Sequence, residues 1–460
     1  MLLKRLAVPL ITIAGLTCGY STNSFAANWL MLQGTESPLT AGRAKVWGFI
    51  QGQYQHDLSS ESAAGKYVPA KLIGPNLTSQ SMANVNRARI GVRGNGMPID
   101  GKVNYFLLLE AGNNGITNGA GNVKATDASI TANHIPFARI RAGLFKYPGS
   151  EEGLQAIHVF DYINFTTVSN QLMLERFPND DNYAKAADGR GNTEAQSLGV
   201  APSGFEKPVG AFRDVGIQIF DSIMIKDYEI SYAAMIGNGN GLNFGDNNGN
   251  KTAYGYFSTE KIFQGKGPRR QGIKVFAWYQ TGLRAYDTKF DSVTSTSTTN
   301  ATVYNTAKIR EYTHYKRERF GGGFKFLKNG YRFTAEYLMG RGMIFLGPHK
   351  ESFDMNAPGG AGDGLLGKAN GWYVDGGWRI PETKFEIDAR YDVYNRLTGD
   401  TLEVNYSTIT LGAQYFMNNK TRVALNYSIR SAKSKNGVAA LENNLTGIGG
   451  RAGIQVTAIY

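Results

Sequence analysis

The last twelve residues of the chain, Gly449–Tyr460, read GGRAGIQVTAIY and end on an aromatic side chain. Apolar side chains occupy every second position of this stretch: Ala452, Ile454, Val456, Ala458 and Tyr460. Polar residues or glycine stand between them: Arg451, Gly453, Gln455 and Thr457. Because successive side chains of a β-strand point to opposite faces, this alternation predicts a strand with one apolar and one polar face.

The same alternation recurs in sixteen segments and predicts the fold class. The candidate strands lie near 44–57, 84–95, 102–112, 124–134, 137–146, 211–221, 227–237, 252–262, 271–284, 314–327, 331–340, 370–380, 384–394, 403–416, 420–432 and 449–460. Almost no other apolar material is left to cover sixteen apolar faces, so we expect lipid to cover them. A closed barrel leaves no strand edge unpaired in lipid. The sequence therefore predicts an all-β protein, a transmembrane antiparallel β-barrel of about 16 strands.

The connections between these segments alternate in length. Short turns such as Ile135-Pro136 and Asn418-Asn419 follow even-numbered candidates, whereas longer stretches rich in Gly, Asn, Ser and Thr follow odd-numbered ones. This rhythm is typical of outer-membrane barrels with short periplasmic turns, long extracellular loops and both termini in the periplasm.

The longest connection, residues 147–210, is the third extracellular loop. Its first part, Ile157–Leu174, is apolar and its later part, Pro178–Asn192, is polar. A loop this long and partly apolar is expected to fold into the lumen and narrow it. Two alternatives stay open: an exposed flap, or a further hairpin from Ile157–Leu174 that would give eighteen strands.

The N-terminal residues predict a targeting segment rather than part of the fold. Lys4 and Arg5 precede the apolar stretch Leu6–Leu16, and small residues before and at Ala26 suit a cleavage site. The single cysteine, Cys18, lies within this segment, so we expect no disulfide in the mature chain. The predicted organisation is a cleaved signal peptide, a periplasmic N-terminal arm and one barrel domain, at residues 1–26, 27–43 and 44–460.

Composition and charge narrow the function further. The chain holds 57 glycines and 12% aromatic residues, which suits a barrel with aromatic girdles better than a compact enzyme core. Its formal net charge is +12, and loss of the targeting segment would lower this by two. An exported barrel does not meet cytoplasmic nucleic acid, so we expect the excess to attract anions in a pore or lipopolysaccharide phosphates.

The alternation also assigns basic residues to the lumen. Candidate anion-lining residues on the strands are Arg87, Arg89, Arg93, Arg139, Arg141, Arg319 and Lys325. Each would cost roughly 2–4 kcal/mol on the lipid face near the midplane, and arginines in a lumen attract anions. The long loop adds three candidates, Arg176, Lys185 and Arg190. The alternative is ordinary pairing with inward acids, which are frequent in the segments near 331–394.

The sequence offers no enzymatic or metal-binding motif. The five histidines are far apart and lack the spacing of metal ligands. The stretch Asp246–Asn250 begins like a calcium loop, but Lys251 stands where the turn glycine belongs. We therefore expect no catalytic residues, no metal and no cofactor, and a protein that is not an enzyme.

Two strands and the loop resemble a known family. Arg87–Gly94 (RARIGVRG) resembles the "RRARLGVKG" strand of the phosphate-selective porin O and P family, and Arg139–Pro148 (RIRAGLFKYP) resembles its "RVGQFKxPFG" strand. Leu174-Glu175-Arg176 is similar to the "ER" that follows in the family's loop. The resemblance covers about the first third of the mature chain. It implies a trimeric outer-membrane channel with an arginine-lined, loop-constricted pore that passes phosphate or similar anions.

Together these patterns predict a Gram-negative outer-membrane porin for passive diffusion of small solutes, with a preference for anions such as phosphate. The expected partners are small anionic solutes, outer-membrane lipid, lipopolysaccharide, the barrel-assembly machinery and two further copies in a homotrimer. A general non-selective porin is one alternative. A barrel that serves as a scaffold or sheath for a partner complex is another, although such sheaths usually lack a constricting loop.

Overall fold

A computed structural model describes most of the chain. The described residues are 28–31, 35, 43–61, 63, 80–96, 99–114, 123–174, 200–201, 205–206, 211–239, 241–242, 245–246, 249–265, 267, 269–289, 311–344 and 367–460. The expected signal peptide and the loop candidates Arg176, Lys185 and Arg190 lie outside these residues.

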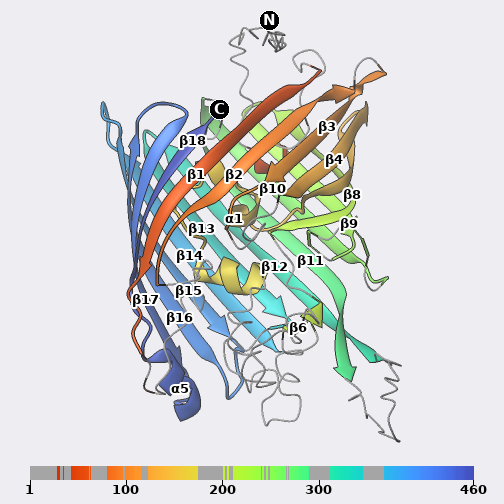
Figure 1. The fold of residues 1–460 in the computed structure, drawn as a ribbon. Helices are drawn as coiled ribbons and strands as arrows, with labels where there is room; N and C mark the ends of the chain where they lie inside the picture. Colours follow the sequence, from red (N-terminus) through yellow and green to blue (C-terminus); the bar gives the residue numbers. More distant parts are fainter. Residues whose placement is uncertain are drawn as a thin grey trace, which may run out of the picture.

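Sixteen antiparallel strands close into one barrel, which confirms the predicted fold class (Figure 1). The first eight are β1 (Lys45–Asp57), β2 (Ser81–Gly96), β3 (Asp100–Glu110), β4 (Lys124–Ile135), β5 (Ala138–Lys146), β8 (Arg213–Ile225), β9 (Tyr228–Gly237) and β10 (Thr252–Gln264). The others are β11 (Gln271–Lys289), β12 (Glu311–Lys328), β13 (Tyr331–Arg341), β14 (Lys368–Arg379), β15 (Phe385–Arg396), β16 (Val404–Phe416), β17 (Thr421–Ser434) and β18 (Arg451–Ile459). Each strand pairs with its neighbours along the chain, and β18 pairs with β1 to close the ring.

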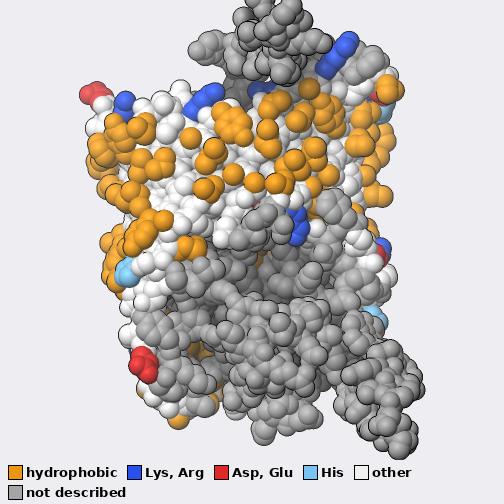
Figure 2. Space-filling view, in the orientation of Figure 1, with side chains coloured by type: hydrophobic (Ala, Val, Ile, Leu, Met, Phe, Trp, Pro, Cys, Tyr) orange, Lys and Arg blue, Asp and Glu red, His pale blue; other side chains and the backbone are white. Residues whose placement is uncertain are grey.

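The two faces of the wall follow the alternation in the sequence. In β15, Ile387 and Tyr391 are exposed on the outside, whereas Asp388, Arg390 and Asp392 are buried inside. Figure 2 shows hydrophobic side chains gathered over the outer face of the strands. No helix among the described residues is long and apolar enough to cross a membrane.

The turns at one end of the barrel are short because their residues suit the backbone they need. Asn329 and Gly330 join β12 to β13, and both have positive φ, 51° and 83°. Two such residues form the hairpin turn whose twist matches that of the flanking strands, and Asn-Gly is its preferred sequence.

The connection after β5 contains no barrel strand in its described part, so the eighteen-strand alternative is wrong. It forms α1 (Glu151–Leu154), a 3-10 turn η2 (Ile157–Val159) and one turn of π-helix, η3 (Ser169–Met173). Further on, β6 (Val200–Ala201) and β7 (Phe205–Glu206) pair only with each other. The sequence prediction also missed a helix, α5 (Ala439–Leu445), between β17 and β18.

The described part of the expected N-terminal arm lies against the inner wall of the barrel. Trp29–Met31 forms a short 3-10 helix, η1, whose Trp29 and Leu30 are buried. The side-chain amide of Asn28 donates to Glu229 Oε1 at 3.0 Å and to Ser231 Oγ at 2.6 Å, both on inward-facing positions of β9. The Trp29 ring and the Asn28 amide thus lie inside the barrel.

The terminal aromatic residue takes part in the closure of the barrel, and we expect its loss to impair assembly. The Tyr460 hydroxyl donates to the Arg89 carbonyl at 2.9 Å, and its backbone N–H donates to the Gly48 carbonyl at 3.0 Å. A Cβ on residue 48 would lie 2.4 Å from the Tyr460 hydroxyl oxygen, so glycine there leaves room for the ring. We expect deletion of Tyr460, or Tyr460→Lys, to lower the amount of protein in the outer membrane severely.

The measurement is the amount of folded, heat-modifiable protein in outer-membrane fractions. Tyr460→Phe is the matched control, because it keeps the ring and the backbone pairing and loses one hydrogen bond of about 1 kcal/mol. Normal levels of the deletion variant would show that the terminal residue is dispensable for closing the barrel.

Candidate functional site

The described part of the long loop, residues 147–174, reaches across the ring of strands. The Glu151 carboxylate lies 2.7 Å from Lys274 Nζ on β11, and the Ile157 carbonyl accepts from Gln51 on β1 at 3.4 Å. These two strands stand eight places apart in the ring of sixteen, so they face each other. Figure 1 shows α1 between the strands in this region. Residues 151–157 therefore connect opposite walls.

The end of this segment is bound to the wall by Arg319 on β12. Its guanidinium donates to the carbonyls of Leu172 at 3.1 Å, Gly342 at 2.9 Å and Met343 at 2.8 Å. Its side chain is 0% exposed. Arg319 was expected to line the pore, but its donors are directed at backbone carbonyls, so it anchors the loop instead.

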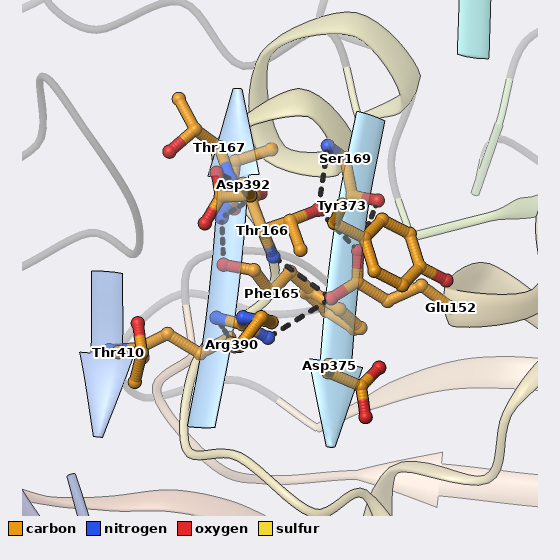
Figure 3. Close-up of polar contacts among 12 residues, drawn as sticks. Glu152, Phe165, Thr166, Thr167, Ser169, Tyr373, Asp375, Arg390, Asp392 and Thr410 are labelled. Atoms are coloured by element: carbon orange, nitrogen blue, oxygen red, sulfur yellow. Dashed lines mark hydrogen bonds and ion pairs between the residues drawn. The ribbon is translucent and has the colours of Figure 1, made fainter. Parts of the chain in front are cut away.

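Glu152 forms a polar cluster between the loop and the wall (Figure 3). Its carboxylate accepts from the Thr166 N–H at 2.9 Å, from the hydroxyls of Thr166 and Ser169, and from Arg390 on β15 at 3.4 Å. Burial raises the pKa of the Glu152 carboxyl, and Arg390 and the hydroxyls act in the opposite direction. The cluster brings residues 152 and 166 together. The segment between them, which includes residues 155–165, therefore forms a loop whose two ends lie close to each other at the wall.

The acidic side of the lumen is organised around Arg332 on β13. Its guanidinium contacts the carboxylates of Asp161 at 3.2 Å, Asp388 at 2.7 Å and Glu386 at 3.8 Å, and it also pairs with Asp375. Asp161 belongs to the loop and the other three to β14 and β15. One cation thus holds four carboxylates together where the loop meets the wall.

Lys325 of β12 lies beside the loop and the N-terminal segment. Its Nζ is 3.9 Å from Glu151 Oε1 and 5.2 Å from the centroid of the Trp29 ring. Glu151 is shared with Lys274, so two lysines face one loop carboxylate. Lys325 faces inward as expected and is in contact with the loop.

The three arginines predicted on β2 also face inward. Arg87 Nη1 donates to Gln51 Oε1 at 2.9 Å, and Arg89 pairs with Glu110 at 2.6 Å. Arg93 lies over the Trp47 ring, 5.5 Å from its centroid. An acid, an amide and an aromatic ring thus surround these three cations.

The two arginines predicted on β5 have different surroundings. Arg139 is partly exposed and pairs with Asp221 on β8 at 3.1 Å. Arg141 is only 1% exposed and stacks on Phe220, with its Cζ 4.3 Å from the ring centroid. Arg141 was expected to line the lumen with Arg139, but its guanidinium packs on rings from its own strand and the next one, Phe145 and Phe220.

Several cations at the loop were missed in the sequence. They are Lys146, Arg213, Lys274, Arg332, Arg390 and Arg422. The alternation that assigned the other residues was sufficient to place Arg332 and Arg390 inside, because their strand neighbours Phe333 and Tyr391 face outward. The alternation puts Lys146 on the same face of β5 as Ala138 and Ile140, yet its Nζ is held by the loop carbonyls of Gly153 and Gln155, both at 2.8 Å.

No group of three or more His, Cys, Asp or Glu side chains among the described residues is arranged to hold a metal ion. His158 of the loop is half-buried, and desolvation together with Arg422 and Arg89 lowers its pKa to about 3. Its imidazole is therefore neutral near pH 7 and contributes an aromatic surface.

Comparisons with known proteins identify the fold. No protein-family model matches the chain, and no curated protein matches its sequence. OmpT of Vibrio cholerae without its loop L8, an outer-membrane protein, is 12% identical, with a TM-score of 0.50 over 91% of this chain and 100% of that one. OmpF of Salmonella typhi in complex with daunomycin is 12% identical, with a TM-score of 0.50 over 91% of this chain and 97% of that one. At this level of identity the likeness shows a shared fold, the sixteen-stranded outer-membrane barrel.

Proposed function

We propose that this chain is a porin of a Gram-negative outer membrane that lets small solutes diffuse passively, with a preference for anions. The observation that carries the proposal is the closed barrel itself, apolar on its outside and charged on its inside. Such a wall is stable in lipid and leaves a polar interior for water and ions. The likeness in fold to outer-membrane proteins of Vibrio and Salmonella supports the same location.

The loop supports a narrowed passage. Residues 151–157 join opposite walls through Lys274 and Gln51, and Arg319 anchors Leu172. A segment bound on several sides stays in place while solutes pass. We therefore assign the constriction role within 147–210 to its described part, 147–174.

The preference for anions rests on an uneven distribution of charge. Between the loop and strands β2, β5 and β8 lie four cations, Arg89, Arg93, Lys146 and Arg213. Glu110 pairs with Arg89 and Asp127 pairs with Arg213, so this side carries more positive than negative charge. Phosphate is one candidate solute, in keeping with the resemblance of the β2 and β5 sequences to phosphate-selective porins.

A general porin is the second candidate, and the acidic cluster around Arg332 favours it. Four carboxylates share that arginine, with additional pairing from Arg269 to Glu386 at 2.6 Å. A basic wall opposite an acidic wall creates an electric field across the lumen. A channel of this kind would conduct both cations and anions. For both candidate functions we also propose that residues 1–26 are cleaved off and that the mature chain assembles into a homotrimer. Lipid and lipopolysaccharide would surround this trimer in the outer membrane.

Zero-current potentials in planar bilayers test the preference. Under a KCl gradient at about 0.1 M salt, we expect the sign of the zero-current potential of wild-type protein to show that chloride permeates more readily than potassium. Near 1 M salt this potential should be smaller, because the Debye length falls to about 3 Å. Arg93→Gln should shift the potential toward potassium at low salt. Lys316→Gln is the matched control, because Lys316 is 64% exposed and pairs with Glu318.

A potassium-selective wild-type channel would contradict the anion preference and leave the general porin. Absence of any conductance from correctly folded protein would contradict the porin proposal and favour a scaffold barrel.

A further inference from the structure

A cavity of about 180 Å³ lies between the loop and the wall, apart from the acidic cluster. Its walls come from the loop segment 154–159, the strands β1–β3, Lys146, Arg213 and the N-terminal Trp29. The cavity is thus built from the N-terminal segment, the loop and five strands of the wall.

Aromatic rings form the apolar part of this cavity. Trp47 lies 6.0 Å from Phe106 and 6.4 Å from Phe49, measured between ring centroids. The His158 ring lies 5.1 Å from Phe49 and 5.8 Å from Trp47. Trp29 completes the lining. An engineered apolar cavity of about 150 Å³ holds benzene, so this one has room for a single ring with a small substituent.

Cations form the polar part. Among the described residues, the lining side chains include Arg89, Arg93, Lys146 and Arg213 and no carboxylate. The acids that pair with Arg89 and Arg213 are Glu110 and Asp127, which do not line the cavity. Desolvation and Arg422 lower the pKa of His158, and Arg89, Lys146 and Arg93 of the cavity act in the same direction, which agrees with a positive potential at this place.

We propose that this cavity is a binding site for small aromatic carboxylates, compounds of one ring and one carboxylate. The aromatic side chains of the cavity pack against the ring of the ligand, and the guanidinium groups bind its carboxylate. Inorganic phosphate would use the cations and leave the aromatic lining in contact with water. The site deepens the proposed porin function, on which it rests, by naming a solute class for the basic side of the passage.

Benzoate is the probe, and binding to the folded, full-length protein in detergent is measured by calorimetry. We expect benzoate to bind roughly tenfold more tightly than acetate or inorganic phosphate, a difference of about 1.4 kcal/mol. Arg93→Gln and Phe106→Ala should each weaken benzoate binding, whereas only Arg93→Gln should weaken acetate binding. Lys316→Gln is the control on the outer side of the barrel. Heat-modifiable migration on gels confirms that each variant is folded.

A second measurement uses the channel. Millimolar benzoate on one side of the bilayer should lower the chloride conductance of wild-type protein, and less so that of Phe106→Ala. Equal affinities for benzoate, acetate and phosphate would overturn the inference in favour of a plain anion site. Chloride conductance without benzoate binding would overturn the inference and leave the porin function intact, whereas benzoate binding without conductance would overturn the porin function alone.

Discussion

Excision of residues 155–165 is expected to raise the single-channel conductance several-fold. This segment contacts β1 through Ile157 and β13 through Asp161. Its removal takes away Phe160, Asp161 and Tyr162 together with the ring of His158. The ends can be rejoined by two or three glycines, because Glu152 accepts from the Thr166 N–H at 2.9 Å and so holds the two ends together. The strands do not change, so the barrel is expected to fold.

Two measurements accompany the excision. Conductance in bilayers gives the size of the effect, and the zero-current potential shows whether selectivity falls with it. The matched control replaces 155–165 by a Gly/Ser segment of equal length, which keeps the chain length and removes the packed side chains. An unchanged conductance in the excised variant would place the narrowest point of the channel outside residues 155–165.

Arg332→Gln is expected to raise the permeability of the channel to cations relative to anions. The substitution leaves Asp161, Asp375, Asp388 and Glu386 close together without the arginine they share. Removing one partner of a buried ion pair costs about 3–5 kcal/mol, so the carboxylates either attract a potassium ion or move the loop away. In both cases the zero-current potential at low salt should shift toward potassium.

The control for Arg332→Gln is Arg270→Gln. Arg270 also pairs with two acids, Glu229 at 2.7 Å and Glu260, and both of these lie on strands, β9 and β10. Arg332→Lys keeps the charge and loses the forked geometry, so it should restore much of the potential. A potential that moves equally in Arg270→Gln would mean that net charge in the lumen, rather than this cluster, decides selectivity.

The sequence by itself determined the barrel wall. In β15 the outward Ile387 and Tyr391 and the inward Asp388 and Asp392 follow from strand geometry and from the cost of charge in lipid. Both causes act locally, residue by residue, so they are readable without knowing any distant contact. The same alternation also predicted the number of strands and placed most of their ends within a few residues.

Only the tertiary structure decided what the inward charges do. The alternation places Arg319, Arg141 and Arg93 on one face, yet one anchors the loop, one stacks on rings and one lines a cavity. Their roles depend on partners far away in the chain, as for Glu152 and Arg390, which are 238 residues apart. The path of the loop and the register of the strands bring such groups together, and neither is a property of a local pattern. The barrel wall could therefore be predicted from the sequence, whereas the arrangement of the charged groups inside the lumen depends on the tertiary fold.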